Sequence, residues 1–304
     1  MTKSLDTLIP DIYALLQQEN TVNEDNLKAL GEEITSVVRD RLESSKGFRQ
    51  PNIRCSNLGV KDRKLYYDMN VKEEEMKEVR FKSSDLIKFM YGDIIEALLI
   101  FFCKEAGHSV TGEQGEVEID GVIGHRDCII DGITTDIKSA SKFAFQKFDK
   151  GTLHQDDPFG YIAQISSYVH ADESPYGAFL AQCKETGQLA LLKVDKMDMI
   201  HPPTRIAHVR DMLEKDAPPE EKCYPPEPQN KGKNAKDNGN IILAKGCGWC
   251  PHKKKCWAGN NDGEGLRSFR YSNGIVDFVH VEKEPKVEEI THWGKVQTDK
   301  KDKE

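Results

Sequence analysis

The chain has 304 residues, a formal net charge of −8 and a hydrophobic fraction of 38%, which is typical of a globular protein with one large domain or two smaller ones. It has no run of 18 apolar residues, so we expect no transmembrane helix. The first twenty residues are acidic and lack a small-residue cleavage site, so we expect no secretion signal. Eight unevenly spaced cysteines favour reduced thiols and a metal site over a disulfide framework, and hence a cytoplasmic location, or the host cytoplasm if the protein is viral.

The N-terminal part of the sequence predicts mainly helices. Amphipathic patterns predict two helices within residues 1–46, the second capped by Asn23. Residues 51–67 are interpreted as a linker followed by a short helix that Ser56 opens. Residues 84–107 predict a long helix whose apolar residues leave little polar face, and a helix of that kind is buried.

The centre of the sequence predicts a tight hairpin, because Asp131-Gly132 lies between β-rich runs at 116–130 and 133–140. Asp-Gly favours a type I′ turn, which needs positive φ at both central residues. Counting outward from the turn predicts the register, in which Ile130 faces Ile133, Ile129 faces Thr134, Cys128 faces Thr135 and Asp127 faces Asp136. Lys138, two residues further along, projects on the same face as Asp136.

Two carboxylates side by side repel each other, so Asp127 and Asp136 need a compensating cation. Mg²⁺ bound by one or two carboxylates and substrate phosphate would supply it, could polarise a phosphoryl oxygen and could lower the pKa of a bound water. Lys138 could orient the nucleophile or neutralise charge on the phosphate. Glu96, within the long apolar helix, would be a third metal ligand or the salt-bridge partner of a core base such as Lys138. A surface hairpin with solvated charges is the alternative.

Two other acids compete for the place of the first carboxylate. Asp131 is used by the turn itself. Asp120 lies seven residues before Asp127, an odd spacing that places it on the other face of an unbulged strand. A bulge would reverse that placement.

Four segments follow in chain order. They are a helix at 157–171, a hairpin with strands at 177–184 and 189–194, a long Pro-, Lys- and Asn-rich loop at 202–245, and a hairpin at 268–281 that turns at Asn273-Gly274. On the predicted helix, Gln164 and Tyr168 are four residues apart and share a face. The tail is highly charged, so its last dozen residues are expected to be disordered.

Three cysteines lie close together in the segment GCGWCPHKKKCW, as Cys247, Cys250 and Cys256. This density favours a metal centre, and thiolates bind zinc or iron–sulfur clusters. A [4Fe–4S] cluster needs four ligands, and the candidates for the fourth are Cys223 and Cys55. His252 could instead complete a Cys₃His zinc site.

A basic strip runs from Asn230 to Trp257, with seven lysines against one acid, Asp237. Such a strip can bind phosphates even in an acidic chain, although a solvated loop is an equal alternative. Arg54, Arg63 and Lys64 could also contact DNA phosphates, or could be ordinary exposed charges.

Together these elements resemble the PD-(D/E)xK nucleases, specifically the RecB-type exonucleases and the CRISPR-associated nucleases with a four-cysteine cluster. The matching elements, in order, are SNLGVKDRKLYY, GDIIE, GHRD, DIK, QISSY and a CxxCx5C pattern. The phage-encoded branch has a similar helical N-terminus and a segment like RSFRYSNG. The resemblance implies an α/β fold with a restriction-endonuclease-like core, that is, a mixed central sheet flanked by helices.

The implied organisation has five parts. They are an N-terminal helical cap at 1–48, a nuclease core at 49–222, a cysteine cluster and basic loop at 223–262, a C-terminal hairpin at 263–290 and a disordered tail at 291–304. In this arrangement the cysteine cluster would staple the C-terminal segment to the core.

The resemblance also implies roles for individual residues. Glu96, Asp127 and Asp136 would bind Mg²⁺ or Mn²⁺ with the Ile137 carbonyl, and Lys138 would position or activate the attacking water. Gln164 and Tyr168 match the family's Q-x3-Y motif, which contacts DNA and supports the active site. Cys247, Cys250 and Cys256 would hold a [4Fe–4S] cluster with Cys223 favoured over Cys55 as the fourth ligand, or zinc instead.

Two departures from the family pattern matter. Arg126 replaces the proline of the nominal motif, a position that takes no part in catalysis, so we expect the change to be harmless. The first cluster cysteine of the family usually precedes the Arg-Lys-Leu run, where this chain has Lys61-Asp62.

The implied activity is that of a metal-dependent DNA exonuclease, a hydrolase of phosphodiester bonds in recombination, repair or viral DNA metabolism. Its partner would be DNA, single-stranded or at duplex ends, with any recombination or helicase partner unknown. The alternatives are an endonuclease or CRISPR-adaptation-type nuclease with the same site, and a non-catalytic DNA-binding subunit with a structural metal cluster.

Overall fold

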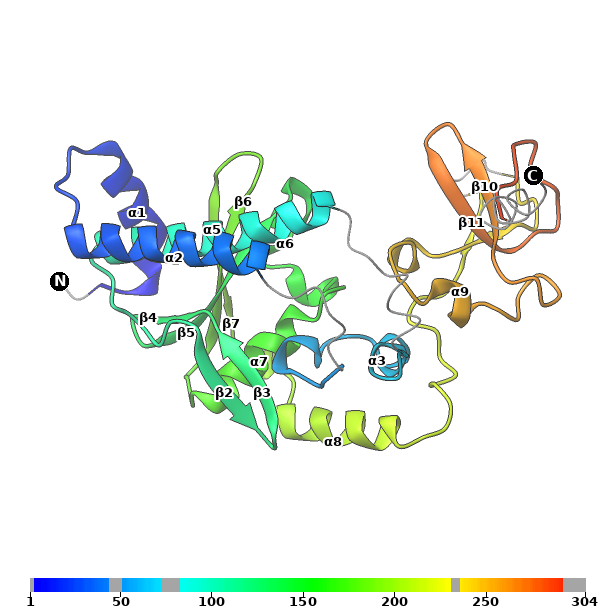
Figure 1. Cartoon of the computed structure of the whole chain (residues 1–304), viewed down its shortest axis with the longest axis horizontal. Coiled ribbons are helices and arrows are strands. Elements are labelled where there is room, and N and C mark those ends of the chain that lie inside the picture. Colours follow the sequence, from blue (N-terminus) through cyan, green and yellow to red (C-terminus); the bar gives the residue numbers. More distant parts are fainter. Residues whose placement is uncertain (1–2, 44–50, 73–82, 231–235, 292–304) are drawn as a thin grey trace. The chain divides into compact units, whose positions relative to one another are not determined.

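The computed structural model describes residues 3–43, 51–72, 83–230 and 236–291 (Figure 1). The end of the expected helical cap, Lys231 and Lys233 of the basic strip, and the expected tail beyond Thr291 lie outside these residues. The chain divides into two compact units: unit 1 contains residues 1–60 and 68–216, and unit 2 contains residues 61–67 and 217–304. In the part of the chain that the structure describes, no helix is long and apolar enough to cross a bilayer.

Unit 1 is built around a mixed five-stranded sheet. In spatial order its strands are β1 (Val110–Thr111), β4 (Cys128–Ile130), β5 (Ile133–Ala140), β6 (Gly177–Cys183) and β7 (Leu189–Val194). The central pair β5 and β6 is parallel, and the other three pairs are antiparallel. The expected α/β class with a mixed central sheet flanked by helices is therefore confirmed.

Helices cover both faces of this sheet. Those that pack on it are α1 (Leu8–Gln17), α5 (Ser83–Glu105), α6 (Lys142–Asp149) and α7 (Tyr161–Ala171). Helix α2 (Glu24–Glu43) packs against α5, and α8 (Pro202–Leu213) buries Ile206 in a separate cluster with Val117 and Val122. On one face, α1 and α5 bury apolar side chains against Ile137 and Leu180. On the other, α6 and α7 pack against Phe179 and Ala181. Successive strand residues face opposite sides, so Asp136, Lys138 and Ala140 of β5 share the α6 and α7 side.

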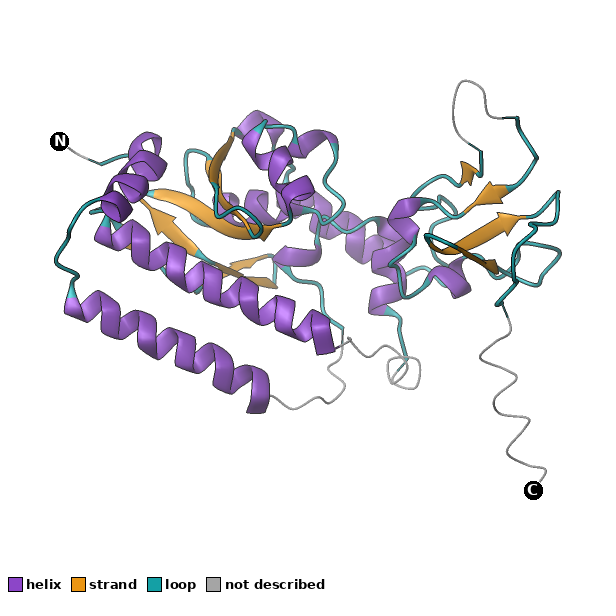
Figure 2. Ribbon diagram, turned by 90° about the horizontal axis from the view of Figure 1, so that it is seen from above, coloured by secondary structure: helices purple, strands orange, loops and turns teal. Residues whose placement is uncertain are grey.

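The N-terminal helices agree with the sequence pattern. Asn23 caps α2, because its Oδ1 accepts hydrogen bonds from the backbone N–H groups of Asp25 and Asn26. Figure 2 shows α2 running alongside α5, and these two helices are in contact. The expectation that the whole of α5 is buried is wrong for its first half, where Ile87 and Tyr91 are exposed. The apolar pattern of that half therefore lies at a surface.

The central hairpin has the predicted register from Ile130↔Ile133 to Cys128↔Thr135. The single strand expected at 116–130 is wrong, because a second hairpin interrupts it: β2 (Gly115–Ile119) pairs with β3 (Val122–Arg126). The cause is a second Asp-Gly turn, in which Asp120 and Gly121 have φ of 47° and 75°. Asp120 is thus a turn residue rather than a strand residue, and its carbonyl accepts a hydrogen bond from Arg210.

Four other boundaries differ from the sequence pattern. Ser56 lies in a 3₁₀ turn (Cys55–Asn57), and the helix begins later, as α3 (Asp62–Met69). Helix α7 begins at Tyr161 because the Asp157 carboxylate accepts its N–H. The loop expected at 202–245 begins with α8, which His201 caps and a proline at the first helical position favours. The last hairpin turns one residue earlier than expected, since Tyr271 pairs with Gly274.

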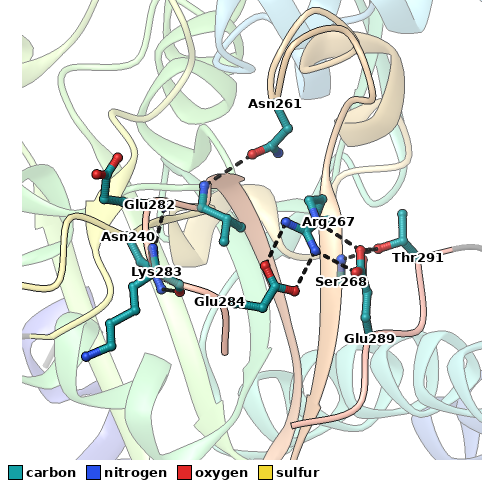
Figure 3. Close-up of polar contacts among 10 residues, drawn as sticks. Asn240, Asn261, Arg267, Ser268, Glu282, Lys283, Glu284, Glu289 and Thr291 are labelled. Atoms are coloured by element: carbon teal, nitrogen blue, oxygen red, sulfur yellow. Dashed lines mark hydrogen bonds and ion pairs between the residues drawn. The ribbon is translucent and has the colours of Figure 1, made fainter. Parts of the chain in front are cut away.

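Unit 2 contains a four-stranded sheet in the order β10-β11-β9-β8. Its strands are β8 (Glu227–Pro228), β9 (Ile241–Ile242), β10 (Arg267–Tyr271) and β11 (Gly274–His280). A short helix, α9 (Lys253–Cys256), and a 3₁₀ turn at Lys245–Cys247 also belong to unit 2. Unit 1 has further 3₁₀ turns at Leu5–Thr7, Leu153–Gln155 and Lys196–Asp198. Figure 3 shows how the last described segment is tied down: Arg267 binds Glu284 and Glu289, and the Asn240 side chain accepts the N–H groups of residues 282 and 283.

Gly59 and Gly31 of unit 1 differ in the space around them. A Cβ at Gly59 would overlap the backbone of Gly160 at the start of α7, whereas nothing lies within 4 Å of a Cβ at Gly31 of α2. We expect Gly59→Ala to lower the free energy of unfolding by about 1–3 kcal/mol, and Gly31→Ala to raise it by up to about 1 kcal/mol. Urea unfolding of both variants measures this. Equal effects of the two substitutions would contradict the close backbone approach.

Candidate active site

Asp136 and Lys138 of β5 form an ion pair, with Lys138 Nζ 2.5 Å from Asp136 Oδ2. Asp136 is fully buried, and neither carboxylate oxygen has a partner with hydrogen-bond geometry. Burial raises the pKa of Asp136, which the charge on Lys138 opposes. Burial alone would lower the pKa of Lys138, but the carboxylates of Asp136 and Asp127 outweigh it and raise that pKa. Lys138 is therefore a charged ammonium.

Asp127 lies beside this pair, but not in the cross-strand position expected for it. The β4–β5 ladder ends at Cys128↔Thr135. Beyond that point Asp127 Oδ2 accepts a hydrogen bond from the Ile137 N–H at 2.6 Å, so its carboxylate takes the place of a strand partner. Burial raises the pKa of Asp127 well above its usual range, and the charges of Asp136 and Glu96 add to the rise.

Glu96 reaches the same group from α5. Its Oε1 accepts a hydrogen bond from Gln114 Nε2. Burial, followed by the charge on Asp136, raises the pKa of Glu96 to about 7. Three carboxylates from α5, the start of β4 and β5 thus interact around one lysine. Gln114 was not anticipated, and nothing in its spacing marks it in the sequence.

The carboxylates of Glu96, Asp127 and Asp136 are the candidate ligands of a divalent metal ion. Within the described ranges, no three His, Cys, Asp or Glu side chains are grouped closely enough to hold a metal ion. The chemistry of the donors nevertheless fits one, because Asp136 is fully buried and the single positive charge of Lys138 must balance Asp136, Asp127 and Glu96. A buried carboxylate costs free energy unless it is protonated or paired with a cation. Mg²⁺ typically takes one or two carboxylates and completes its shell with water.

Gln164 and Tyr168 meet as the helical spacing predicted, since Gln164 Nε2 donates to Tyr168 Oη at 3.2 Å. Both line a groove of about 1050 Å³ in unit 1, together with Arg54, His125 and Arg210. Burial raises the pKa of Tyr168, so its hydroxyl keeps its proton. Arg54 is exposed in this groove, as a phosphate contact requires.

Tyr161 is a site residue that the sequence analysis missed. Lys138 Nζ lies 4.9 Å from the centroid of the Tyr161 ring. A signal was present, because Tyr161, Gln164 and Tyr168 recur at i, i+3 and i+7 and so share one face of a helix.

Arg126 replaces the family's proline, a change expected to be harmless. Its side chain is held in place by an ion pair. Its Nη1 lies 2.9 Å from Asp172 Oδ1, and Asp172 Oδ2 accepts a hydrogen bond from Thr134 of β5. The guanidinium packs so closely against Gly112 and Gly115 that neither glycine has room for a Cβ. Arg126 thereby ties the chain to the sheet one residue before Asp127.

Four cysteine thiols of unit 2 influence one another electrostatically, although within the described residues they are not grouped closely enough to hold a metal ion. Burial raises the pKa of Cys247 to about 11, and the neighbouring thiols of Cys250, Cys223 and Cys256 add to the rise. Cys223 lies beside the Arg-Lys-Leu run, since the Lys64 backbone donates a hydrogen bond to its thiol.

The other cysteine-site candidates are placed differently. Cys55 is fully buried in the core of unit 1, with its Sγ 3.8 Å from the Val122 carbonyl. The His252 ring is buried, with its centroid 5.5 Å from that of Tyr67.

Arg63, a candidate for contact with DNA phosphates, lies at the cysteine group. Its Nε donates to Cys256 Sγ at 3.1 Å, and other guanidinium nitrogens donate to the Pro219 carbonyl and to Tyr67 Oη. Lys222 Nζ donates to the Cys256 carbonyl and lies 3.8 Å from the same Sγ. Two cations therefore surround one thiol.

No protein-family model matches the chain, and no curated protein matches it significantly. Among solved structures, the chain is similar to that of SSO0001, with 18% identity and a TM-score of 0.38 over 61% of this chain and 87% of the other. It is also similar to the alkaline exonuclease LHK-Exo from Laribacter hongkongensis, with 14% identity and a TM-score of 0.33 over 52% and 91% of the two chains.

The pKa of Glu96 makes stability depend on pH. It is about 7 in the folded chain against an ordinary 4.5, so folding favours the protonated form. That contribution is complete below pH 4.5 and is lost as the pH rises through about 7. In EDTA, we expect the melting temperature of the wild type to fall relative to that of Glu96→Gln across this window. Parallel plots of melting temperature against pH for the wild type and Glu96→Gln would contradict this prediction. Glu33→Gln, at an exposed site on α2, is the control and should follow the wild type.

Proposed function

We propose that this protein is a metal-dependent deoxyribonuclease of the PD-(D/E)xK type that acts as an exonuclease on DNA. The observation that carries the proposal is the fully buried carboxylate of Asp136, which forms an ion pair with Lys138 at 2.5 Å. Asp127 and Glu96 add their charges to the same group. A merely structural ion pair would gain nothing from two further acids, because each added carboxylate raises the cost of burial.

Glu96, Asp127 and Asp136, with the Ile137 carbonyl, would hold Mg²⁺ or Mn²⁺. Such an ion polarises a phosphoryl oxygen and lowers the pKa of a bound water. The contact of Asp127 with the Ile137 N–H keeps its carboxylate next to β5. Because the pKa of Lys138 is raised, its side chain is a hydrogen-bond donor and a positive charge, not a general base. Lys138 would therefore orient the attacking water or stabilise charge that develops on the scissile phosphate.

The groove lined by Gln164 and Tyr168 would hold the DNA strand. Tyr168 remains a phenol, since its pKa is raised, so it can donate to a phosphate oxygen. Arg54 supplies a positive charge in the same groove. Contacts of this kind bind the backbone and carry no sequence information, as suits an enzyme that degrades DNA regardless of sequence.

In unit 2, Cys223, Cys247, Cys250 and Cys256 would hold a [4Fe–4S] cluster, with zinc as the alternative. Mutual pKa effects among the four thiols support this set. The positive charges of Arg63 and Lys222 at Cys256 fit the net negative charge that four thiolates bring to either centre.

Digestion of end-labelled linear DNA, single- and double-stranded, tests the nuclease. We expect degradation in Mg²⁺ or Mn²⁺ and none in EDTA. Asp136→Asn and Lys138→Ala should each lower kcat by at least about 100-fold, whereas Lys150→Ala, at an exposed lysine of the same unit, should leave it unchanged.

Melting curves accompany the digestion to show that each variant is folded. Asp136→Asn should stay folded, because Asp127 and Glu96 still compensate Lys138. DNA binding without metal-dependent cleavage by the folded wild type would reject the nuclease and favour a DNA-binding subunit.

Metal analysis after anaerobic purification tests the cysteine site. We expect a brown protein with iron and sulfide in the ratio of a [4Fe–4S] cluster, and Cys223→Ala should lose most of the metal. Cys55→Ala should retain it, because Cys55 packs in the core of unit 1. If Cys55→Ala loses the metal while Cys223→Ala retains it, Cys55 rather than Cys223 is the fourth ligand. A colourless protein that contains zinc would reject the iron–sulfur cluster.

A further inference from the structure

An exposed aromatic ring lies next to the candidate active site. Phe159 is 62% exposed, and its ring stacks on that of Tyr161, with centroids 5.4 Å apart and planes 26° apart. The side chain that carries the stack, Tyr161, also lies 4.9 Å from Lys138 Nζ. The proposed mechanism uses Lys138 but leaves the Phe159 ring without a role.

The stack is held rigidly. Tyr161 packs against Phe148 and Phe179, with ring centroids 6.2 Å and 6.3 Å away. The Asp157 carboxylate accepts the N–H groups at the start of α7, including that of Tyr161. Gly160, between the two stacked residues, has a φ of +76° and packs against the Gly59 backbone. The Phe159 ring therefore lies in a prearranged position, which lowers the entropic cost of binding a ligand to it.

The position of the Phe159–Tyr161 stack beside Lys138 indicates what kind of ligand it can bind. A phosphodiester bound at Asp136 and Lys138 carries a nucleobase on each side of the scissile bond. Phe159 is separated from Lys138 by the Tyr161 ring alone. Its exposed ring can therefore stack on the flat face of such a base. Stacking of this kind tolerates any base, because every base has a π-face.

We propose that Phe159 and Tyr161 form a stacking platform for an unpaired nucleobase of single-stranded DNA next to the scissile phosphate, and hence that the enzyme prefers unpaired ends. This inference rests on the proposed nuclease function. In a duplex the faces of each base are covered by its neighbours, so the platform can engage only a base that has left the stack. A single-stranded end offers that base without the cost of unstacking a pair.

The test uses single-stranded oligonucleotides with 2-aminopurine at or next to the labelled end, whose fluorescence is quenched by stacking. Binding is measured with Ca²⁺ in place of Mg²⁺, and kcat and KM are then measured with Mg²⁺. Phe159→Ala is compared with Phe159→Tyr, which keeps an aromatic ring. Phe143→Ala is the matched control, since Phe143 is 72% exposed on α6 and its ring lies near Lys147.

We expect Phe159→Ala to lose the quenching and to raise the Kd and KM for single strands about five-fold to a hundredfold, with kcat within about two-fold. Phe159→Tyr and Phe143→Ala should behave as the wild type. On blunt duplexes the effect of Phe159→Ala should be smaller.

The outcomes separate this inference from the nuclease proposal. Metal-dependent cleavage with no change in Phe159→Ala would overturn the platform and leave the nuclease standing. Quenching that depends on Phe159 without cleavage by the wild type would support the platform and reject the nuclease. An equal loss on blunt duplexes and single strands would overturn the preference for unpaired ends. No binding of either DNA would overturn both proposals.

Discussion

The ion pair between the fully buried Asp136 and Lys138, with the partly buried acids Asp127 and Glu96 beside it, is the constraint on which the rest of unit 1 depends. Asp136 is removed from water and is compensated by Lys138 at 2.5 Å, and Lys138 also interacts with the charges of Asp127 and Glu96. A folded chain keeps such an arrangement only where the surrounding packing holds it in place. The apolar layers on the two faces of the β5–β6 pair provide that packing.

The supports of this site are mostly backbone features. Asp127 completes the edge of β5 with its side chain just before β4 begins, and Arg126, the preceding residue, is held by Asp172. The close approach of Gly59 and Gly160 sets the start of α7, from which Tyr161 and Gln164 project. In unit 2 the main charged contacts are different. Arg63 and Lys222, from two separate segments, both lie at the Cys256 thiol.

Local patterns predicted those parts of the fold that depend on neighbours in sequence. The Asp131-Gly132 turn gave the register of β4 and β5 correctly, and helical spacing brought Gln164 to Tyr168. The errors have local causes as well. A second Asp-Gly turn at Asp120-Gly121 divided one expected strand into two, and a capped, proline-initiated helix replaced the start of an expected loop.

By itself, the sequence determined the α/β class, the central hairpin, and the residue types available for an acidic site and a thiol site. Only the tertiary structure decided that the charge of Asp136 acts on Glu96, that Arg63 donates to Cys256, and that Tyr161 lies under Lys138. The physical reason is the range of the interactions. Turn conformation and helical or strand periodicity depend on residues a few positions apart. Burial and charge compensation depend on elements that are distant in sequence and adjacent only once the chain has folded.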